Sequence, residues 1–129
     1  MADNPLAIKV LQLMVGSLVV FGGASLSVFA SNQLGIALGL VHLSIGVFGL
    51  LTGFLILRTR ALPRRLLIAV NVVTIAYSLF SEILVQIESL LPSFALTGSL
   101  IGTVVAIIMS GAIVYSLSRA RNSFMIHTT

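Results

Sequence analysis

The stretch LGIALGLVHLSIGVFGLLTGFLIL, from Leu34 to Leu57, decides the fold because its twenty-four residues carry no formal charge. Small or polar positions recur through it at spacings of 4, 3, 4, 3 and 4 residues. These positions are Gly35, Gly39, His42, Gly46, Gly49 and Gly53. On a helix with about 3.6 residues per turn they share one face, within an arc of roughly 80°. The stretch therefore predicts a helix with one glycine-lined face and one apolar face.

A helix of this composition suits a membrane better than water. In water each glycine costs about 1 kcal/mol of helix stability relative to alanine. In a bilayer, unmade backbone hydrogen bonds cost more than that, and faces of small residues allow two helices to approach closely. We therefore expect Leu34 to Leu57 to be a transmembrane helix whose glycine face docks on another helix.

The composition of the whole chain points to a single membrane domain over residues 1–129. Of these residues, 58% are hydrophobic and 8% are charged, whereas about 25% of a soluble protein is charged. The absence of cysteine excludes disulfides and thiolate metal sites. The net charge of +4 does not indicate nucleic acid, because the basic residues stand at the edges of apolar segments.

Four apolar segments are long enough to cross a membrane, at about residues 6–30, 34–57, 66–91 and 94–117. The predicted fold is an all-α, four-helix transmembrane bundle with short turns. The first segment also resembles a cleavable signal peptide, because Lys9 precedes an apolar run that ends in Val28-Phe29-Ala30. That run is long for such a peptide, so we expect the segment to be retained as a span.

Two further segments repeat the spacing of small residues. Gly16 and Gly23 form such a series in the first span, and Gly98 and Gly102 form one in the fourth. Together with the glycines of the second span, they are the predicted helix-packing seams. The helix that packs on each seam belongs either to this chain or to a neighbouring subunit.

The distribution of basic residues predicts the orientation. All seven Lys and Arg residues fall on one side of a four-span arrangement: Lys9, Arg58, Arg60, Arg64, Arg65, Arg119 and Arg121. Because positive residues are retained in the cytoplasm, both termini and the basic loop should be cytoplasmic. The four arginines of the loop are also candidates for contact with lipid headgroups.

Polar residues within the spans are the candidate site. The third span lacks glycine and carries a polar stripe of Asn71, Thr74, Ser78, Glu82 and Gln86. Counting at ~1.5 Å per residue places His42 ~12 Å and Glu82 ~9 Å from the same membrane face. One hypothesis is that the two side chains meet, as a pair that shares a proton or binds a cation. The alternatives are a histidine that locks two helices through a backbone carbonyl, and a glutamate that contacts Gln86, Ser78 or the headgroups.

No enzyme motif is present, and the two histidines (the second is His127) make no metal cluster, so neither a metal nor a cofactor is expected. The preferred function is a non-catalytic membrane subunit that packs through glycine seams in a larger complex or homo-oligomer. Its partners would be the bilayer and other membrane subunits or itself, and not nucleic acid. The alternative is a minimal transporter or proton/cation pathway centred on His42 and Glu82. A polar stripe that faces a cavity would favour transport, and one that faces a dry seam would favour assembly.

Overall fold

A computed structural model describes residues 5–59 and 63–119, and every regular element in these ranges is an α-helix. The helices are α1 (Pro5–Phe29), α2 (Gln33–Ile56), α3 (Arg64–Glu88) and α4 (Ser93–Arg119). The predicted all-helical fold is confirmed for the described residues. All four helices are long and apolar enough to cross a membrane, judged by length and composition.

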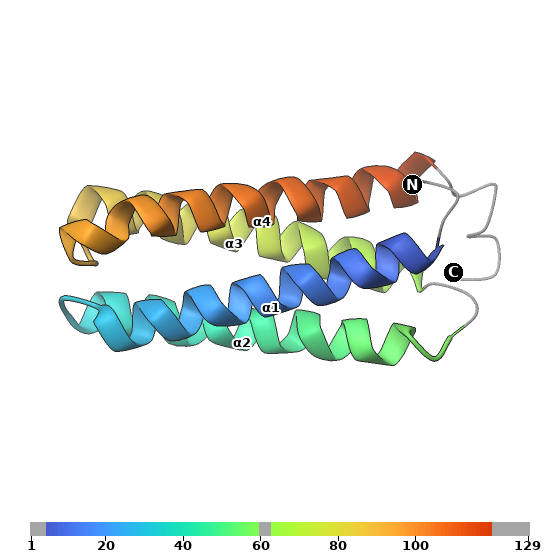
Figure 1. Ribbon diagram of the computed structural model, residues 1–129, viewed down its shortest axis with the longest axis horizontal. Coiled ribbons are helices and arrows are strands. Elements are labelled where there is room, and N and C mark those ends of the chain that lie inside the picture. The colour runs from blue at the N-terminus through green and yellow to red at the C-terminus, as the bar shows by residue number, and fades with distance from the viewer. Residues whose placement is uncertain (1–4, 60–62, 120–129) are drawn as a thin grey trace.

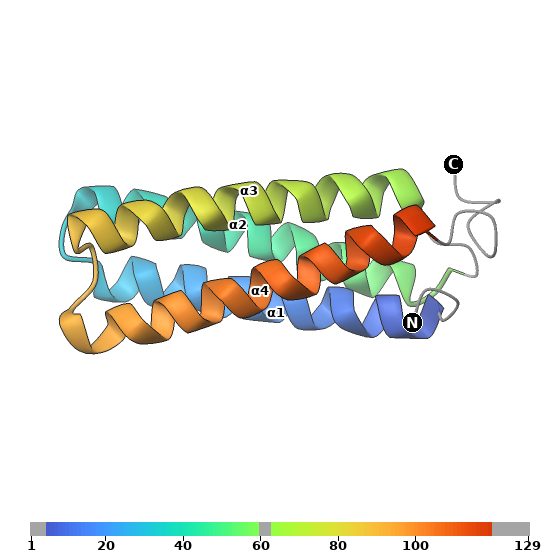
Figure 2. The ribbon, with the colours of Figure 1, turned by 90° about the horizontal axis from the view of Figure 1, so that it is seen from above.

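The helices form a bundle in which each contacts two antiparallel neighbours. α1 packs against α2 and α4, and α3 packs against the same two helices from the other side. Figure 1 shows the two hairpins, α1–α2 and α3–α4, stacked with their connecting turns at one end. Figure 2, seen from above, shows that α4 slants across the other helices.

Local sequence signals set the helix ends at the turns. Asn32 precedes α2, and its side-chain Oδ1 accepts a hydrogen bond of 3.1 Å from the Gly35 amide, which satisfies one unpaired donor of the first turn. The third predicted span ends at Leu91, whereas α3 ends at Glu88. The helix stops earlier because Ser89 takes a left-handed conformation with φ 50°, which closes α3 and turns the chain.

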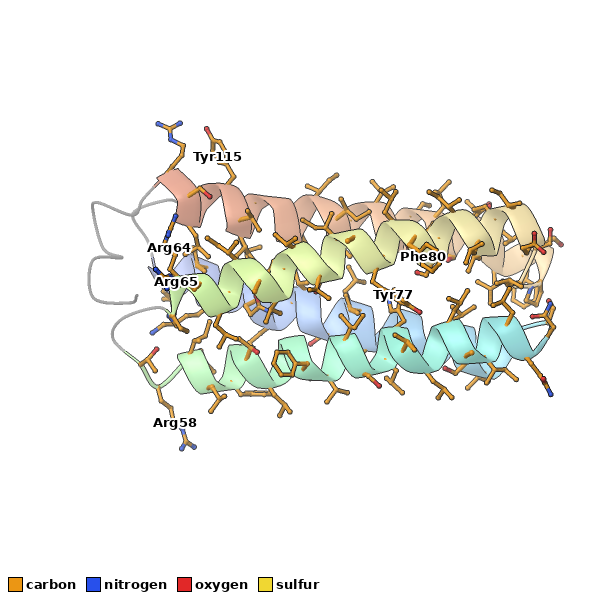
Figure 3. The ribbon with its side chains drawn as sticks, turned by 180° about the vertical axis from the view of Figure 1, so that it is seen from behind. Arg58, Arg64, Arg65, Tyr77, Phe80 and Tyr115 are labelled. Carbon is orange, nitrogen blue, oxygen red and sulfur yellow. The ribbon has the colours of Figure 1, made fainter. Side chains whose placement is uncertain are left out.

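The two ends of the bundle differ in chemistry. We call the end with the turns at residues 30–32 and 89–92 the turn end; there the Ser31 amide donates to the Leu90 carbonyl at 2.7 Å. We call the opposite end, where the described Lys and Arg residues gather, the basic end; Figure 3 shows Arg58, Arg64 and Arg65 there. Lys9 Nζ donates to the Thr59 carbonyl at 2.6 Å at this end. Of the predicted orientation residues, Arg60 and Arg121 lie outside the described residues, as does His127.

Apolar side chains fill the bundle in two clusters and also cover its outside. The larger cluster includes Ile8, Ile56, Leu67 and Leu117 and lies toward the basic end. The smaller cluster lies toward the turn end and includes Leu26, Leu38, Val85 and Leu90. Many large apolar side chains are exposed on the outer faces of all four helices, as expected of helices whose surroundings are apolar.

Candidate functional site

Glycines bring α1 and α2 into backbone contact. A Cβ atom added to Gly46 would lie 2.5 Å from the Val20 amide nitrogen, and one added to Gly16 would lie 2.6 Å from that of Leu50. A Cβ on Gly23 would likewise collide with the Leu43 backbone. Such distances leave no room for any larger residue, so this seam depends on the missing side chains.

The other predicted seam glycines of the first hairpin also contact their neighbours. A Cβ on Gly39 would lie 2.6 Å from the Ser27 amide nitrogen, one on Gly53 would lie 2.8 Å from Leu13 Cδ2, and one on Gly35 would lie 2.7 Å from Ala30 Cβ. Gly49 is less crowded, since its nearest such atom is Gln12 Nε2 at 3.4 Å. The glycine faces of α1 and α2 therefore pack largely against each other.

The glycines of α4 behave differently. No heavy atom of the described chain lies within 4 Å of a Cβ added to Gly98, Gly102 or Gly111. Gly98 and Gly102 instead line a cavity of about 340 Å³. The predicted seam on α4 thus has no packing partner among the residues that the structure describes.

The cavity lies between α1 and α4 in the half of the bundle nearer the turn end, and all four helices contribute to it. Three exposed aromatic residues, Phe21, Phe29 and Phe94, line it and form its rim. Its polar groups come mainly from α2, α3 and α4. They are His42, Ser78, Ser81, Glu82, Ser99 and Thr103, and α1 adds Ser25. The cavity therefore has an apolar entrance and a polar floor.

Glu82 is the centre of the floor and is only 6% exposed. Its Oε1 accepts hydrogen bonds from Ser99 Oγ at 2.7 Å and Thr103 Oγ1 at 2.9 Å. Its Oε2 accepts one from Gln86 Nε2 at 2.6 Å, and the same nitrogen also donates to the Leu96 carbonyl at 2.9 Å. Three donors thus point at the Glu82 carboxyl group, an arrangement that suits an ionised carboxylate, and the bonds from Ser99, from Thr103 and to Leu96 tie α3 to α4.

His42 lines the same cavity but has other partners. Its Nδ1 lies 3.4 Å from Ser81 Oγ, and its ring meets that of Tyr77 edge to face with centroids 5.9 Å apart. Tyr77, labelled in Figure 3, donates to the Leu38 carbonyl at 2.9 Å. Within the described residues no hydrogen bond or ion pair joins His42 to Glu82. The two residues thus line one cavity, and no hydrogen bond of the described residues joins them directly.

Asn71, the residue of the polar stripe nearest the basic end, lies in a second cluster that is separate from the cavity. Asn71 Nδ2 donates to Gln12 Oε1 at 2.7 Å and to the Leu67 carbonyl at 2.8 Å. Gln12 Nε2 in turn donates to the Gly49 carbonyl at 3.0 Å, so the cluster links α1, α2 and α3. Both side chains are fully buried. Asn71 Oδ1 and Ser110 Oγ are buried without a hydrogen-bond partner.

Several of these residues were not among the predicted ones. Gln12 was missed although it is a lone amide in an apolar run, a signal that the sequence does carry. Ser99 and Thr103 stand four residues apart, and each directly follows a predicted seam glycine, Gly98 or Gly102. The glycine spacing therefore drew attention away from these two hydroxyl groups. Facing polar positions on two adjacent helices would have been the sign of the cavity.

The chemistry available at this site is that of a carboxylate, an imidazole and hydroxyl groups. Within the described ranges, no three His, Cys, Asp or Glu side chains come together as a metal site. The five described Lys and Arg residues are at the basic end, so none of them neutralises Glu82. No protein-family model, curated protein or solved structure matches this chain.

Proposed function

We propose that this chain is a multi-pass membrane protein that takes up a cation in the cavity between α1 and α4, as a minimal, non-catalytic transporter or cation pathway. The observation that carries the proposal is the direction of the polar stripe. In the half of α3 nearer the turn end, Ser78, Ser81 and Glu82 line the cavity. A buried carboxylate that no Lys or Arg of the described residues reaches is a functional candidate by default within a membrane.

The orientation follows from the basic end. All seven Lys and Arg residues of the sequence stand at or beside that end in a four-span arrangement, which makes it cytoplasmic by the positive-inside rule. The cavity then lies in the non-cytoplasmic half. Single cysteines placed at Asn32 and at Arg58 should be labelled from opposite sides by a membrane-impermeant thiol reagent. Labelling of both from one side would contradict this topology.

A cation bound at Glu82 would also weaken the contact between α3 and α4. The Glu82 carboxylate is held by Ser99 and Thr103 of α4, so a cation that binds it competes with those donors. Toward the basic end, the larger apolar cluster and the Gln12–Asn71 cluster fill the bundle. Passage to the cytoplasmic side therefore requires a rearrangement. Movement of α4, whose glycines have no close neighbour, would be the least costly one.

Charge movement across reconstituted membranes tests the proposal. On a solid-supported membrane, concentration jumps of protons, sodium and methylammonium should evoke a current with the unaltered protein for at least one of these cations. Glu82→Gln should abolish it, because the amide cannot supply the negative charge. Glu88→Gln is the matched control, since Glu88 is an exposed carboxylate on the same helix. Currents no larger than those of protein-free membranes, or equal in both variants, would contradict the proposal.

Assembly into a larger complex is the second candidate, and the unoccupied small-residue face of α4 favours it. Gly98 and Gly102 allow close approach and have no partner within the described chain. The mass of the native particle, extracted under mild conditions, tests this candidate. A particle larger than one chain that Gly102→Leu disperses would favour assembly, whereas a monomer with full cation-driven current would contradict it.

A further inference from the structure

We propose that the ligand of the cavity is an amphiphile with a protonated primary amine, which enters sideways from the apolar phase between α1 and α4. This inference rests on the proposed cation site and specifies what occupies it. It combines two features of the cavity, namely the rim that opens to the outside and the acceptors that form the floor.

The rim favours an apolar chain. Phe21, Phe29 and Phe94 are 72%, 52% and 78% exposed on the outer surface, where lipid would surround them. Behind them the walls are mostly aliphatic, with Leu18, Val19, Leu26, Val85 and Leu91 among the lining residues. The volume of about 340 Å³ falls within the range of about 300–1,000 Å³ that is typical of small-molecule sites. A simple hydrated ion would leave these apolar walls unused.

The floor favours a positive charge. Glu82 receives only donated hydrogen bonds: Oε1 accepts two and Oε2 accepts one, which leaves a lone-pair site on Oε2 for a further donor. No basic side chain of the described residues reaches it, because those residues are at the opposite end. An anionic amphiphile would place two like charges in a medium of low dielectric constant, which is strongly unfavourable.

The hydrogen-bond pattern of His42 favours a headgroup that carries N–H donors. Ser81 Oγ donates to the Ser78 carbonyl at 3.3 Å, which favours the His42 tautomer whose Nδ1–H donates across the 3.4 Å contact with Ser81. In the neutral ring Nε2 is then an acceptor. This nitrogen faces α1, 3.5 Å from a Cβ placed on Gly22, and makes no hydrogen bond to a described residue. Glu82 and His42 therefore offer two acceptors, which a primary ammonium can satisfy and a quaternary ammonium cannot.

Calorimetric titration tests this assignment on the full chain in nanodiscs of zwitterionic lipid, with empty nanodiscs as the blank. Dodecylamine, protonated at neutral pH, should bind at one saturable site. Dodecyltrimethylammonium and Glu82→Gln should each weaken binding by about tenfold or more, because a hydrogen bond to a charged group is lost. Glu88→Gln should leave it unchanged. Dodecyl sulfate should not bind.

A second pair of variants tests the cavity without altering its polar groups. Gly102→Leu places a side chain in the cavity where a Cβ meets nothing within 4 Å, and Gly111→Leu does the same outside the lining. The first should abolish binding and the second should not, with helix content by circular dichroism unchanged in both.

The outcomes separate the ligand from the function. Equal affinity for dodecylamine and dodecyltrimethylammonium would overturn the requirement for N–H donors, and equal effects of Glu82→Gln and Glu88→Gln would overturn the site. Saturable, Glu82-dependent dodecylamine binding without any charge movement would leave the ligand assignment standing and overturn transport. Glu82-dependent current without dodecylamine binding would do the reverse.

Discussion

The two helical hairpins carry the same kind of glycine spacing but use it in different ways. In α1–α2 the helices touch through their backbones, so that a Cβ on Gly46 would lie 2.5 Å from the Val20 nitrogen. In α3–α4 no described heavy atom lies within 4 Å of a Cβ on Gly98 or Gly102. Small residues at helical spacing thus show where a close approach is possible, and the neighbouring helix decides whether it occurs.

The difference lies in what each hairpin offers the facing helix. α2 presents its glycines to a second small-residue series on α1, and dispersion contacts between backbones hold the pair. α3 has no glycine, and it holds α4 through Glu82, whose partners Ser99 and Thr103 keep a fixed separation. Polar contacts of this kind leave space beside them, and the cavity occupies that space.

Alanine substitution at one glycine of each hairpin should show the largest difference in unfolding free energy between the two hairpins. Gly46→Ala forces a methyl group against the α1 backbone, and we expect a loss of about 1–3 kcal/mol of unfolding free energy, as for overpacking in general. Gly102→Ala meets no neighbour and raises helix propensity, so stability should be unchanged or higher by up to about 1 kcal/mol. Reversible unfolding in mixed micelles, followed by circular dichroism, measures both values.

Gly49→Ala is the internal control for this comparison. Its nearest neighbour is the end of the Gln12 side chain at 3.4 Å, which is able to move, so the loss should be smaller than for Gly46→Ala. Equal losses at Gly46 and Gly102 would show that the seam has no special role in holding α1 to α2.

The helices were predictable because each depends on local signals. The apolar runs, the Asn32 cap and the turns between the spans all lie within a few neighbouring residues of the sequence, and bounds from composition alone come close to the observed ones. The exception was the end of α3. Ser89 takes a left-handed conformation there, and a serine, unlike a glycine, does not indicate this conformation in the sequence.

The site was predictable only in its residue types. His42 and Glu82 stand out as polar groups in apolar spans, counting along antiparallel helices predicts a similar depth for them, and both line one cavity. Whether they touch depends on helix rotation and on competing partners, which the spacing does not encode. The Glu82 carboxylate accepts hydrogen bonds from Ser99 and Thr103, and the His42 ring contacts Ser81.

The Gln12–Asn71 contact, which joins the two hairpins, should show a smaller effect than the seam. Gln12→Met removes the acceptor of Asn71 Nδ2 and the donor to the Gly49 carbonyl. Interhelical hydrogen bonds in membrane proteins contribute about 0.6 kcal/mol on average and up to about 1.7, and this one is fully buried. We expect a loss near the upper value, measured by the same unfolding experiment.

Asn71→Leu, alone and combined with Gln12→Met, completes that test. Replacing both partners with apolar groups of similar size removes the unpaired amide as well as the bond, so the double variant should lose less than the sum of the single ones. Additive losses would show that the two amides do not stabilise each other.

The smallest expected effect concerns the cavity floor, and it distinguishes two possible partners of Glu82. Glu82→Gln and Ser99→Ala remove the two sides of one 2.7 Å hydrogen bond. Residues in contact show coupling energies of about 0.5 kcal/mol or more, so this double-mutant cycle should be non-additive. Glu82→Gln with His42→Ala should show a smaller coupling, because no hydrogen bond of the described residues joins these two side chains. Coupling as large for His42 as for Ser99 would mean that the two acceptors already share a proton. The floor would then have one acceptor to offer a ligand in place of two, and the preference for a primary over a quaternary ammonium would lose its basis.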